Sequence, residues 1–283
     1  MEKRGYYYSF VLQKSMWEIF RSHTLFRLTS AQCLTDKQRN NGLRKINSLS
    51  WNTNMTDQEF ISLWQNLGFP CKSHPWHGVE IGSEAPHCLT VYIEIVPTDN
   101  VKYELDKKSG HLRVDRPQRY SNVCPTLYGL IPQTYCGQSV AELSAKQTNR
   151  PSLVGDHDPL DICVLTEKTI THGDLLLEAI PIGGLRMIDG DEADDKIVAI
   201  LKGDAMHEQW RDIKDCPVSF VERLMHYFLT YKDAPGSQKK NCEITHVYGR
   251  EEAHDVIRRS QADYFAKFGQ LQTQLASIGS TFN

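Results

Sequence analysis

The stretch LTVYIEIVPTDNVKYELDKKSGHLRVDR, residues 89–116, decides the fold class. Apolar residues alternate in its first part, at Leu89, Val91, Ile93 and Ile95. This period of two predicts a strand over 89–96, with Glu94 on the face opposite the apolar residues. VKYEL (101–105) and LRVDR (112–116) flank a turn signal at Ser109-Gly110, so they predict a hairpin. Lys102 and Glu104 are expected on its polar face.

Apolar runs predict further strands downstream, at 160–166, 175–182, 185–188 and 196–201. No helical pattern separates them, so a βαβ alternation is not expected. Helical spacing returns after Pro217, a residue suited to a first helical position. The apolar stripe of that helix is Val218, Val221, Leu224, Met225 and Phe228. A second helix is predicted at 250–268. Strands first and helices last predict a mainly β α+β fold: a small closed antiparallel barrel, OB-like, with the C-terminal helices packed outside.

Composition excludes several classes of protein. The chain has 283 residues, 40% of them hydrophobic, and a net charge of -3, so nothing indicates a general nucleic-acid binder. No apolar run approaches the roughly 18 residues of a membrane span. The eight cysteines never form a CxxC pair, so we expect them to be reduced and a zinc site to be absent. A cytoplasmic protein is the expectation.

The N-terminal segment 1–54 differs from the rest of the chain. It carries nine Lys/Arg and three Asp/Glu, a net charge of +6, whereas the remainder has 23 against 32, a net charge of -9. Such a basic extension is typical of a poorly ordered tail or an organelle-targeting peptide, and Met55 is an alternative start. Thr56 and Glu59 then form a capping pattern for a short helix that ends at Gly68. Residues 55–283 are expected to form one catalytic domain.

Acidic residues concentrate between 156 and 196, where eleven acids face three bases. Most lie in DHDPLD (156–161) and DGDEADDK (189–196), each beside an apolar strand. Leu160 and Ile162 are expected in the core, so Asp161 faces away from them at the start of a strand. Carboxylates this close raise one another's pKa unless hard divalent cations lie between them, and Mg²⁺ is the common choice.

Three alternatives compete with a metal site. Acid-rich loops are often only solvated surface. An EF-hand loop would use Asp156, Asp158 and Glu167, but Leu160 stands where a ligand is needed and Asp161 where the turn requires Gly. Backbone amides could also satisfy all three acids of DHDPLD.

The string DHDPLD resembles the aspartate signature of soluble family I inorganic pyrophosphatases. Other motifs of that family follow in the same order between 89 and 265. They are Ile93-Glu94-Ile95, Lys102-Tyr103-Glu104, Asp115-Arg116, Tyr128-Gly129 in an apolar loop, Gly184 to Asp189, Asp194-Asp195-Lys196, and His226-Tyr227-Phe228 with Tyr231-Lys232. The resemblance implies Mg²⁺-dependent hydrolysis of pyrophosphate to two orthophosphates, with several Mg²⁺ ions per site.

The resemblance also implies a role for each motif residue. The metal ligands would be Asp156, Asp161, Asp189, Asp194 and Glu94. Asp158 would accept the proton of the attacking water. The phosphates would be held by Lys102, Arg116, Tyr128, Lys196, Tyr231 and Lys232. Glu104 and Asp115 would orient the basic residues.

The sequence departs from the family pattern at His157, which stands where most members have a small or amide residue, and in a long insertion at 131–154. A homo-oligomer is expected, although the insertion leaves its size open. Either Lys239 or Lys240 could be a further basic contact. Two rivals remain: a barrel that binds oligonucleotides, which the acidic mouth disfavours, and a phosphoesterase acting on nucleotides, which the lack of a Gly-rich loop disfavours.

Overall fold

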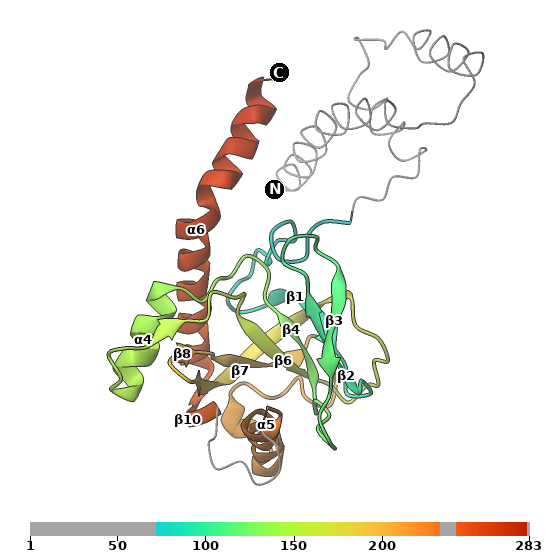
Figure 1. Cartoon of the computed structure of the whole chain (residues 1–283). Helices are drawn as coiled ribbons and strands as arrows, with labels where there is room; N and C mark the ends of the chain where they lie inside the picture. Colours follow the sequence, from blue (N-terminus) through green and yellow to red (C-terminus); the bar gives the residue numbers. More distant parts are fainter. Residues whose placement is uncertain (1–71, 233–241, 282–283) are drawn as a thin grey trace, which may run out of the picture. The chain divides into compact units, whose positions relative to one another are not determined.

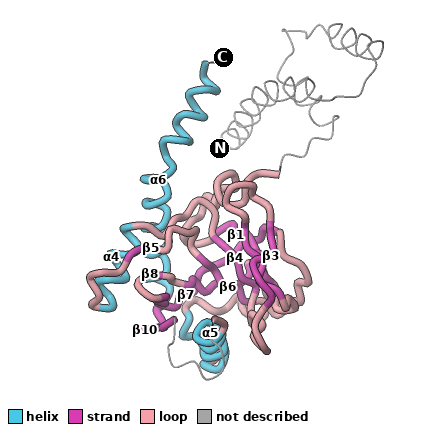
Figure 2. The backbone as a smooth tube through the Cα atoms, in the orientation of Figure 1, coloured by secondary structure: helices cyan, strands magenta, loops and turns pink. Residues whose placement is uncertain are grey.

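Five strands pair side by side into a closed ring at the centre of the protein (Figures 1 and 2). The computed structural model describes residues 72–232 and 242–281, with side chains up to residue 269. The order around the ring is β1 (Leu89–Ile95), β4 (Leu127–Leu130), β6 (Asp161–Leu165), β9 (Lys196–Leu201) and β7 (Leu175–Asp189), and β7 pairs again with β1. The predicted mainly β class with a closed ring is confirmed.

One pairing of the ring differs from the prediction. β6 and β9 run parallel, in the register Asp161↔Lys196 to Leu165↔Ile200, whereas an all-antiparallel barrel was expected. In the sequence, β7 lies between β6 and β9. The chain reverses direction before β7 and again before β9, which pairs antiparallel with β7, so β9 runs in the same direction as β6. The strands predicted at 175–182 and 185–188 are confirmed as strand, but the break between them is wrong, because both belong to the continuous β7. Its register shifts between Pro181 and Gly183, so the strand bends there and continues.

The residues at this bend explain why the strand does not end. Gly184 lies so close to Tyr248 that a Cβ would be 2.4 Å from the tyrosine ring. Glycine is therefore needed for close packing, not for a turn. Tyr248 belongs to β10 (Cys242–Gly249), which pairs with the second half of β7 and was not predicted.

Smaller strands complete the sheet. β5 (Val154–Gly155) pairs in parallel with β8 (Glu192–Ala193), and β8 pairs with the end of β7. The predicted hairpin is confirmed as a separate two-stranded sheet of β2 (Val101–Leu105) and β3 (Leu112–Pro117). Tyr128-Gly129, expected in a loop, lies in β4.

Two buried clusters occupy opposite faces of the ring strands. In β6, Ile162 and Val164 join a cluster with residues of α6 (Arg250–Thr281). Cys163 and Leu165 join a second cluster with residues of α5 (Val218–Thr230). The face of each strand residue therefore decides which helix it contacts. Ile95 was predicted to share a face with Ile93, but a register shift between them turns it toward the α5 cluster.

Three α-helices are described, and they lie outside the ring (Figure 2). Helix α5 confirms the first C-terminal prediction, but Pro217 is its N-cap and Val218 is 72% exposed, so Val218 is not part of the buried stripe. Helix α6 begins where predicted and is longer. Helix α4 (Gln138–Thr148) lies in the insertion and was not predicted. A 3-10 turn, η1 (Ile213–Asp215), precedes α5.

Some predictions lie outside the described residues: the 1–54 extension, the helix at 56–68, and Lys239 and Lys240. Among the described helices, none has the length and apolar character to cross a bilayer. The six cysteines of the described ranges are free, as expected.

Candidate active site

Strand alternation brings the predicted acidic and basic residues onto one face. Asp161 shares its face of β6 with Cys163 and Leu165, and Lys196 shares its face of β9 with Val198 and Ile200. Both faces are turned toward α5. The parallel register places Asp161 directly opposite Lys196. Polar residues at the starts of two neighbouring strands are thus brought together above an apolar core.

Two further strands of the ring, β4 and β7, contribute side chains to the same face. Tyr128 lies across from Cys163 in the register of β4 and β6, and its hydroxyl donates a 2.6 Å hydrogen bond to Asp161 Oδ2. Asp189 ends β7 on the face of Leu185 and Met187, which pack in the α5 cluster.

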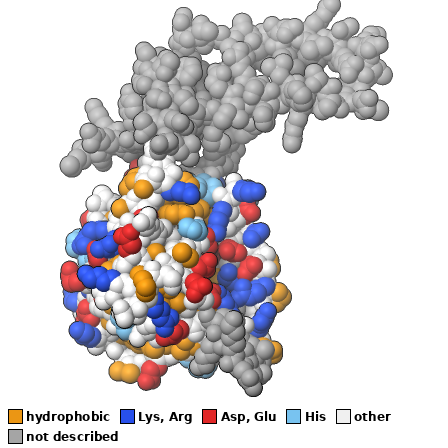
Figure 3. Space-filling model, turned by 60° about the vertical axis from the view of Figure 1, so that its left-hand side comes forward, with side chains coloured by type: hydrophobic (Ala, Val, Ile, Leu, Met, Phe, Trp, Pro, Cys, Tyr) orange, Lys and Arg blue, Asp and Glu red, His pale blue; other side chains and the backbone are white. Residues whose placement is uncertain are grey.

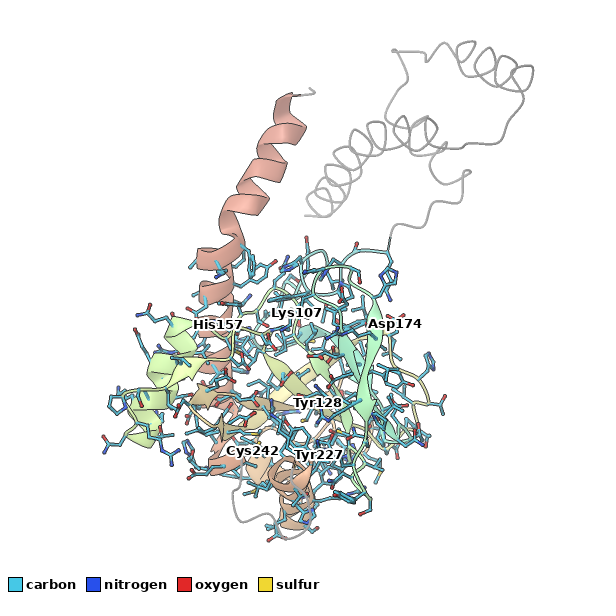
Figure 4. All side chains as sticks on the ribbon, in the orientation of Figure 1. Lys107, Tyr128, His157, Asp174, Tyr227 and Cys242 are labelled. Atoms are coloured by element: carbon cyan, nitrogen blue, oxygen red, sulfur yellow. The ribbon has the colours of Figure 1, made fainter. Side chains whose placement is uncertain are left out.

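The end of α5 supplies two of the predicted phosphate-binding residues. Tyr231 follows the last helical residue, and its ring packs against Phe228 at 5.9 Å between centroids. Lys232 comes next and forms an ion pair with Asp189. Figure 4 shows Tyr128 and Tyr227 close together on this side of the ring. Packing of the apolar residues of α5 therefore holds the polar residues Tyr231 and Lys232, which follow the helix, at the site.

Backbone contacts fix the loop that carries the DHDPLD motif. The Asp158 N–H donates to Asp156 Oδ1 at 2.9 Å, and the Cys136 N–H donates to the Asp158 carbonyl at 2.8 Å. Gly155 approaches the Cys136 carbonyl so closely that a Cβ would lie 2.1 Å away. His157 has a φ of 66°, a conformation that small and amide residues adopt more easily. Its Nδ1 lies 2.7 Å from the Tyr135 hydroxyl, so the side chain is held away from the acids.

One cavity collects twelve of the fourteen predicted site residues. They are Glu94, Lys102, Glu104, Tyr128, Asp156, Asp158, Asp161, Asp189, Asp194, Lys196, Tyr231 and Lys232. Arg116 and Asp115 do not line it. Acidic and basic side chains also lie next to one another on the face seen in Figure 3.

The two residues outside the lining, Arg116 and Asp115, contact each other on the hairpin. Arg116 Nη1 donates to Asp115 Oδ2 at 2.8 Å, and Lys102 Nζ lies 3.1 Å from the same oxygen. The Arg116 guanidinium is 5.8 Å from the centre of the Tyr231 ring. Asp115 thus contacts two of the predicted phosphate-binding cations, and its orienting role stays a prediction. The expected separation of faces on β2 is incomplete, because Tyr103 and Leu105 also line the cavity.

The lining carries more negative than positive charge. Eight of its residues are Asp or Glu and four are Lys. The Lys196 ammonium lies between the Asp161 and Asp194 carboxylates and donates to both. Over the described ranges, no three Asp, Glu, His or Cys side chains converge on one point as a metal site would require. Lys196 contacts two of the eight acids, Asp161 and Asp194. Three lysines remain for the other six carboxylates of the lining, so the positive charge does not balance the negative charge.

The pKa values of the cavity acids reflect burial and this excess of negative charge. Burial and the nearby Asp194 carboxylate raise the pKa of Asp156 to about 9, and burial raises that of Glu94 to about 8, although the Leu105 N–H donates to it at 2.6 Å. Burial opposes ionisation of Asp194 as well, but the Lys196 ammonium outweighs it and lowers the pKa of Asp194. At neutral pH, carboxyl groups with such raised pKa values ionise only when a positive charge is added beside them. Carboxylate oxygens are the ligands of hard divalent cations, so these residues suit such a cation.

A pH dependence of stability follows for the metal-free protein. Folding raises the pKa of Asp156 from 3.8 to about 9 and of Glu94 from 4.5 to about 8, so both acids bind more protons in the folded state than in the unfolded one. Burial lowers the pKa of His77 and His254 from 6.5 to about 4, which acts in the opposite direction below pH 6.5. Above pH 6.5 the two acids dominate, and the free energy of unfolding must fall as the pH rises. We expect Tm in EDTA to fall by at least about 2–4 °C from about pH 6.5 to about pH 8.5, the shift that about 1 kcal/mol causes in a domain of this size. Saturating Mg²⁺ should flatten the dependence, as measured by calorimetry. A Tm that rises over this pH range in EDTA would contradict these pKa directions.

Two charged residues of the cavity, Lys107 and Glu192, were not predicted from the sequence. Lys107, in the hairpin turn, forms an ion pair with Asp158, and Glu192 lies in β8. The Lys107 carbonyl is 3.2 Å from His74 Nε2, which ties the turn to the segment before β1. No local pattern in DKKSG separates Lys107 from Lys108; only the fold of the hairpin does so. Figure 4 shows Lys107 on the same side of the molecule as Tyr128.

Comparison with known proteins decides the family. A family model described as inorganic pyrophosphatase matches residues 91–265, more than half of the chain. The chain belongs to the inorganic pyrophosphatase family. An inorganic pyrophosphatase of Chlamydia caviae is 50% identical over 206 residues, which cover 71% of this chain and 95% of that protein. A soluble inorganic pyrophosphatase of Arabidopsis thaliana is 36% identical over 196 residues, covering 69% of this chain and 80% of that protein.

Solved structures of pyrophosphatases agree with the fold. The Helicobacter pylori enzyme superposes with a TM-score of 0.54 at 30% identity, over 66% of this chain and 98% of that one. Enzymes of this family hydrolyse inorganic pyrophosphate to orthophosphate, and this member is a hydrolase with that activity. The resemblance expected from the motifs is confirmed.

Proposed function

We propose that this pyrophosphatase works with Mg²⁺ held by Asp156, Asp161, Asp189, Asp194 and Glu94. The observation that carries the proposal is the excess of carboxylates over lysines in one cavity, with raised pKa values for Asp156 and Glu94. When bound, Mg²⁺ would lower the pKa of a coordinated water and neutralise charge on the two phosphates. Lys196, which contacts Asp161 and Asp194 here, would then turn its ammonium toward a phosphate.

The basic residues have a separate task in this proposal. Lys102, Lys196, Lys232 and Tyr231 line the cavity and would hold the phosphates, and Arg116 would reach them from beside Tyr231. An Arg suits bidentate contact with a phosphate, whereas a Lys acts as a point charge. Tyr128, whose hydroxyl donates to Asp161, would orient that carboxylate as well as contact substrate.

Asp158 would act as the base. It lies between Asp156 and Pro159 in a loop fixed by backbone hydrogen bonds, and it is partly exposed to the cavity. A carboxylate that does not need its full charge for metal binding can accept a proton from the attacking water. Lys107 is its ion-pair partner in the cavity.

Replacing Asp161 by Asn is expected to raise the Mg²⁺ concentration for half-maximal activity by about tenfold or more. Asn is of similar size and keeps an oxygen that can accept from Tyr128, so folding should be retained, while one ligand charge is lost. Orthophosphate release in a Mg²⁺ titration measures the effect. Asp191→Asn is the matched control, because Asp191 belongs to the same acidic string but is exposed and does not line the cavity. An unchanged Mg²⁺ requirement in Asp161→Asn would remove Asp161 from the ligand set.

Ca²⁺ is expected to bind but to support little turnover. It is larger than Mg²⁺ and accepts about 6 to 8 oxygens in irregular geometry, so water and phosphate would be placed less accurately. Competition between the two ions in the orthophosphate assay, with Tm as an independent sign of Ca²⁺ binding, tests this. Full activity in Ca²⁺ alone would contradict the proposed role of an octahedral Mg²⁺ site.

Assembly and location stay predictions from the sequence. A homo-oligomer in the cytoplasm is expected, with pyrophosphate as substrate and no nucleic-acid partner. Light scattering coupled to size exclusion gives the mass of the assembly. The basic 1–54 segment keeps organelle targeting open as the alternative.

A further inference from the structure

A buried polar network lies on the opposite side of the strands from the active-site cavity. Its centre is the ion pair of Arg186 in β7 with Asp195 between β8 and β9, 3.2 Å apart and with both side chains 0% exposed. Arg186 also donates to Ser144 Oγ of α4 and to Glu252 Oε1 of α6, each at 2.7 Å. The Tyr248 hydroxyl of β10 donates to Asp195 at 3.0 Å. Neither Arg186 nor Asp195 lines the cavity.

The position of Asp195 in the sequence connects this network to the site. Its two neighbours are Asp194 and Lys196, which both line the cavity. In an extended chain successive side chains point to opposite faces, so fixing Asp195 on the α6 side fixes its neighbours on the α5 side. The backbone contacts agree: Asp194 N–H donates to the Met187 carbonyl at 3.0 Å, and Leu185 lies opposite Lys196.

We infer that Arg186 and Asp195 are positioning residues that set the direction of Asp194 and Lys196 in the cavity. The inference rests on the proposed roles of Asp194 in metal binding and Lys196 in phosphate binding. A buried ion pair is a poor way to gain stability alone, because removing two charges from water offsets most of their attraction. It does define one geometry, since the pair is satisfied only when β7, α4, α6 and β10 are all in place.

The hydrogen bonds of Asp195 allow a sharp test. Both Arg186 and Tyr248 contact the same oxygen, Oδ2, while Oδ1 is buried without a partner among the described residues. The single carbonyl oxygen of an Asn can therefore replace Oδ2 and keep both contacts. Asp195→Asn should leave the Mg²⁺ concentration for half-maximal activity at the parent value, clearly below the rise expected when a positioning contact is removed.

The double variant Arg186→Met with Asp195→Leu replaces the buried ion pair with apolar side chains. The variant should keep its circular dichroism spectrum, but its Tm should fall, because Ser144, Glu252 and the Tyr248 hydroxyl each lose a partner. If the pair positions Asp194 and Lys196, the Mg²⁺ requirement should still rise by about tenfold, together with the KM for pyrophosphate. A purely structural role would move Tm and leave both constants unchanged.

The controls separate the possible failures. Arg259→Met with Asp255→Leu makes the same changes in a partly exposed pair on α6, away from the cavity, and should leave all constants near the parent values. Asp194→Asn tests the proposed function itself: if it does not raise the Mg²⁺ requirement, the role of Asp194 is wrong, whatever the network does. If Asp194→Asn raises it and the folded double variant does not, the positioning inference is overturned.

A further variant covers the case in which the double variant does not fold. Tyr248→Phe removes only the hydroxyl that donates to Asp195. We expect a smaller rise in the Mg²⁺ requirement, about threefold, in the direction of the double variant. A folded Tyr248→Phe enzyme with parent constants would overturn the inference.

Discussion

Replacing Asp158 by Asn is expected to lower kcat by about 10² to 10⁴ with little change in the Mg²⁺ requirement. Asn keeps the size of the side chain but cannot accept a proton. Asp158 differs in its surroundings from Asp161, which contacts both Tyr128 and Lys196, whereas the side-chain partner of Asp158 is Lys107. A group outside the densest acidic cluster can be lost without much loss of metal binding, so the two acids should fail differently.

The measurement is orthophosphate release at saturating Mg²⁺ over a range of pH. The acidic limb of the rate profile should shift or flatten in Asp158→Asn, because that limb reports the essential base. Asp191→Asn, an exposed acid of the same region, serves as the control and should keep the parent profile. If Asp158→Asn mainly weakens Mg²⁺ binding while its saturated kcat stays near the parent value, Asp158 is another ligand and not the base.

Alternation along single strands made much of the fold predictable. Burial on both faces makes β1 and β6 distinctly apolar, and the hairpin of β2 and β3 has a clear turn signal. The features that were missed depend on distant contacts. The parallel register of β6 and β9 and the continuity of β7 through Gly183 arise from pairing across the ring and from the close approach of Tyr248 to Gly184. Neither cause is visible within a short window of sequence.

The site was predictable in its residue types but not in its contacts. Asp161 could be placed at a strand start because Leu160 and Ile162 had to be buried, and both are. The ion pair of Lys107 with Asp158 could not be predicted, because a lysine in a polar turn is usually only solvated. The distance of Arg116 from the cavity lining depends on how the hairpin sits on the ring, which no pattern of the hairpin itself defines.

We expect the same cavity to favour pyrophosphate over a nucleotide. Four of its five aromatic residues pack on one another: Tyr128 lies against Phe228 at 5.9 Å and Tyr227 against Tyr231 at 5.4 Å between ring centroids. They are therefore not free to stack on a nucleotide base. Four lysines in the lining suit two adjoining phosphates. ATP can offer a phosphoric anhydride to this site, but without base contacts to align it, and a small misplacement costs about a hundredfold in rate.

Orthophosphate release from pyrophosphate and from ATP, measured on the same enzyme with and without Mg²⁺, tests the central claim most directly. We predict that pyrophosphate is hydrolysed at least about a hundredfold faster than ATP in Mg²⁺, and that EDTA abolishes both activities until Mg²⁺ is restored. Comparable rates on the two substrates, or full pyrophosphate hydrolysis in EDTA, would contradict a metal-dependent site built for inorganic pyrophosphate.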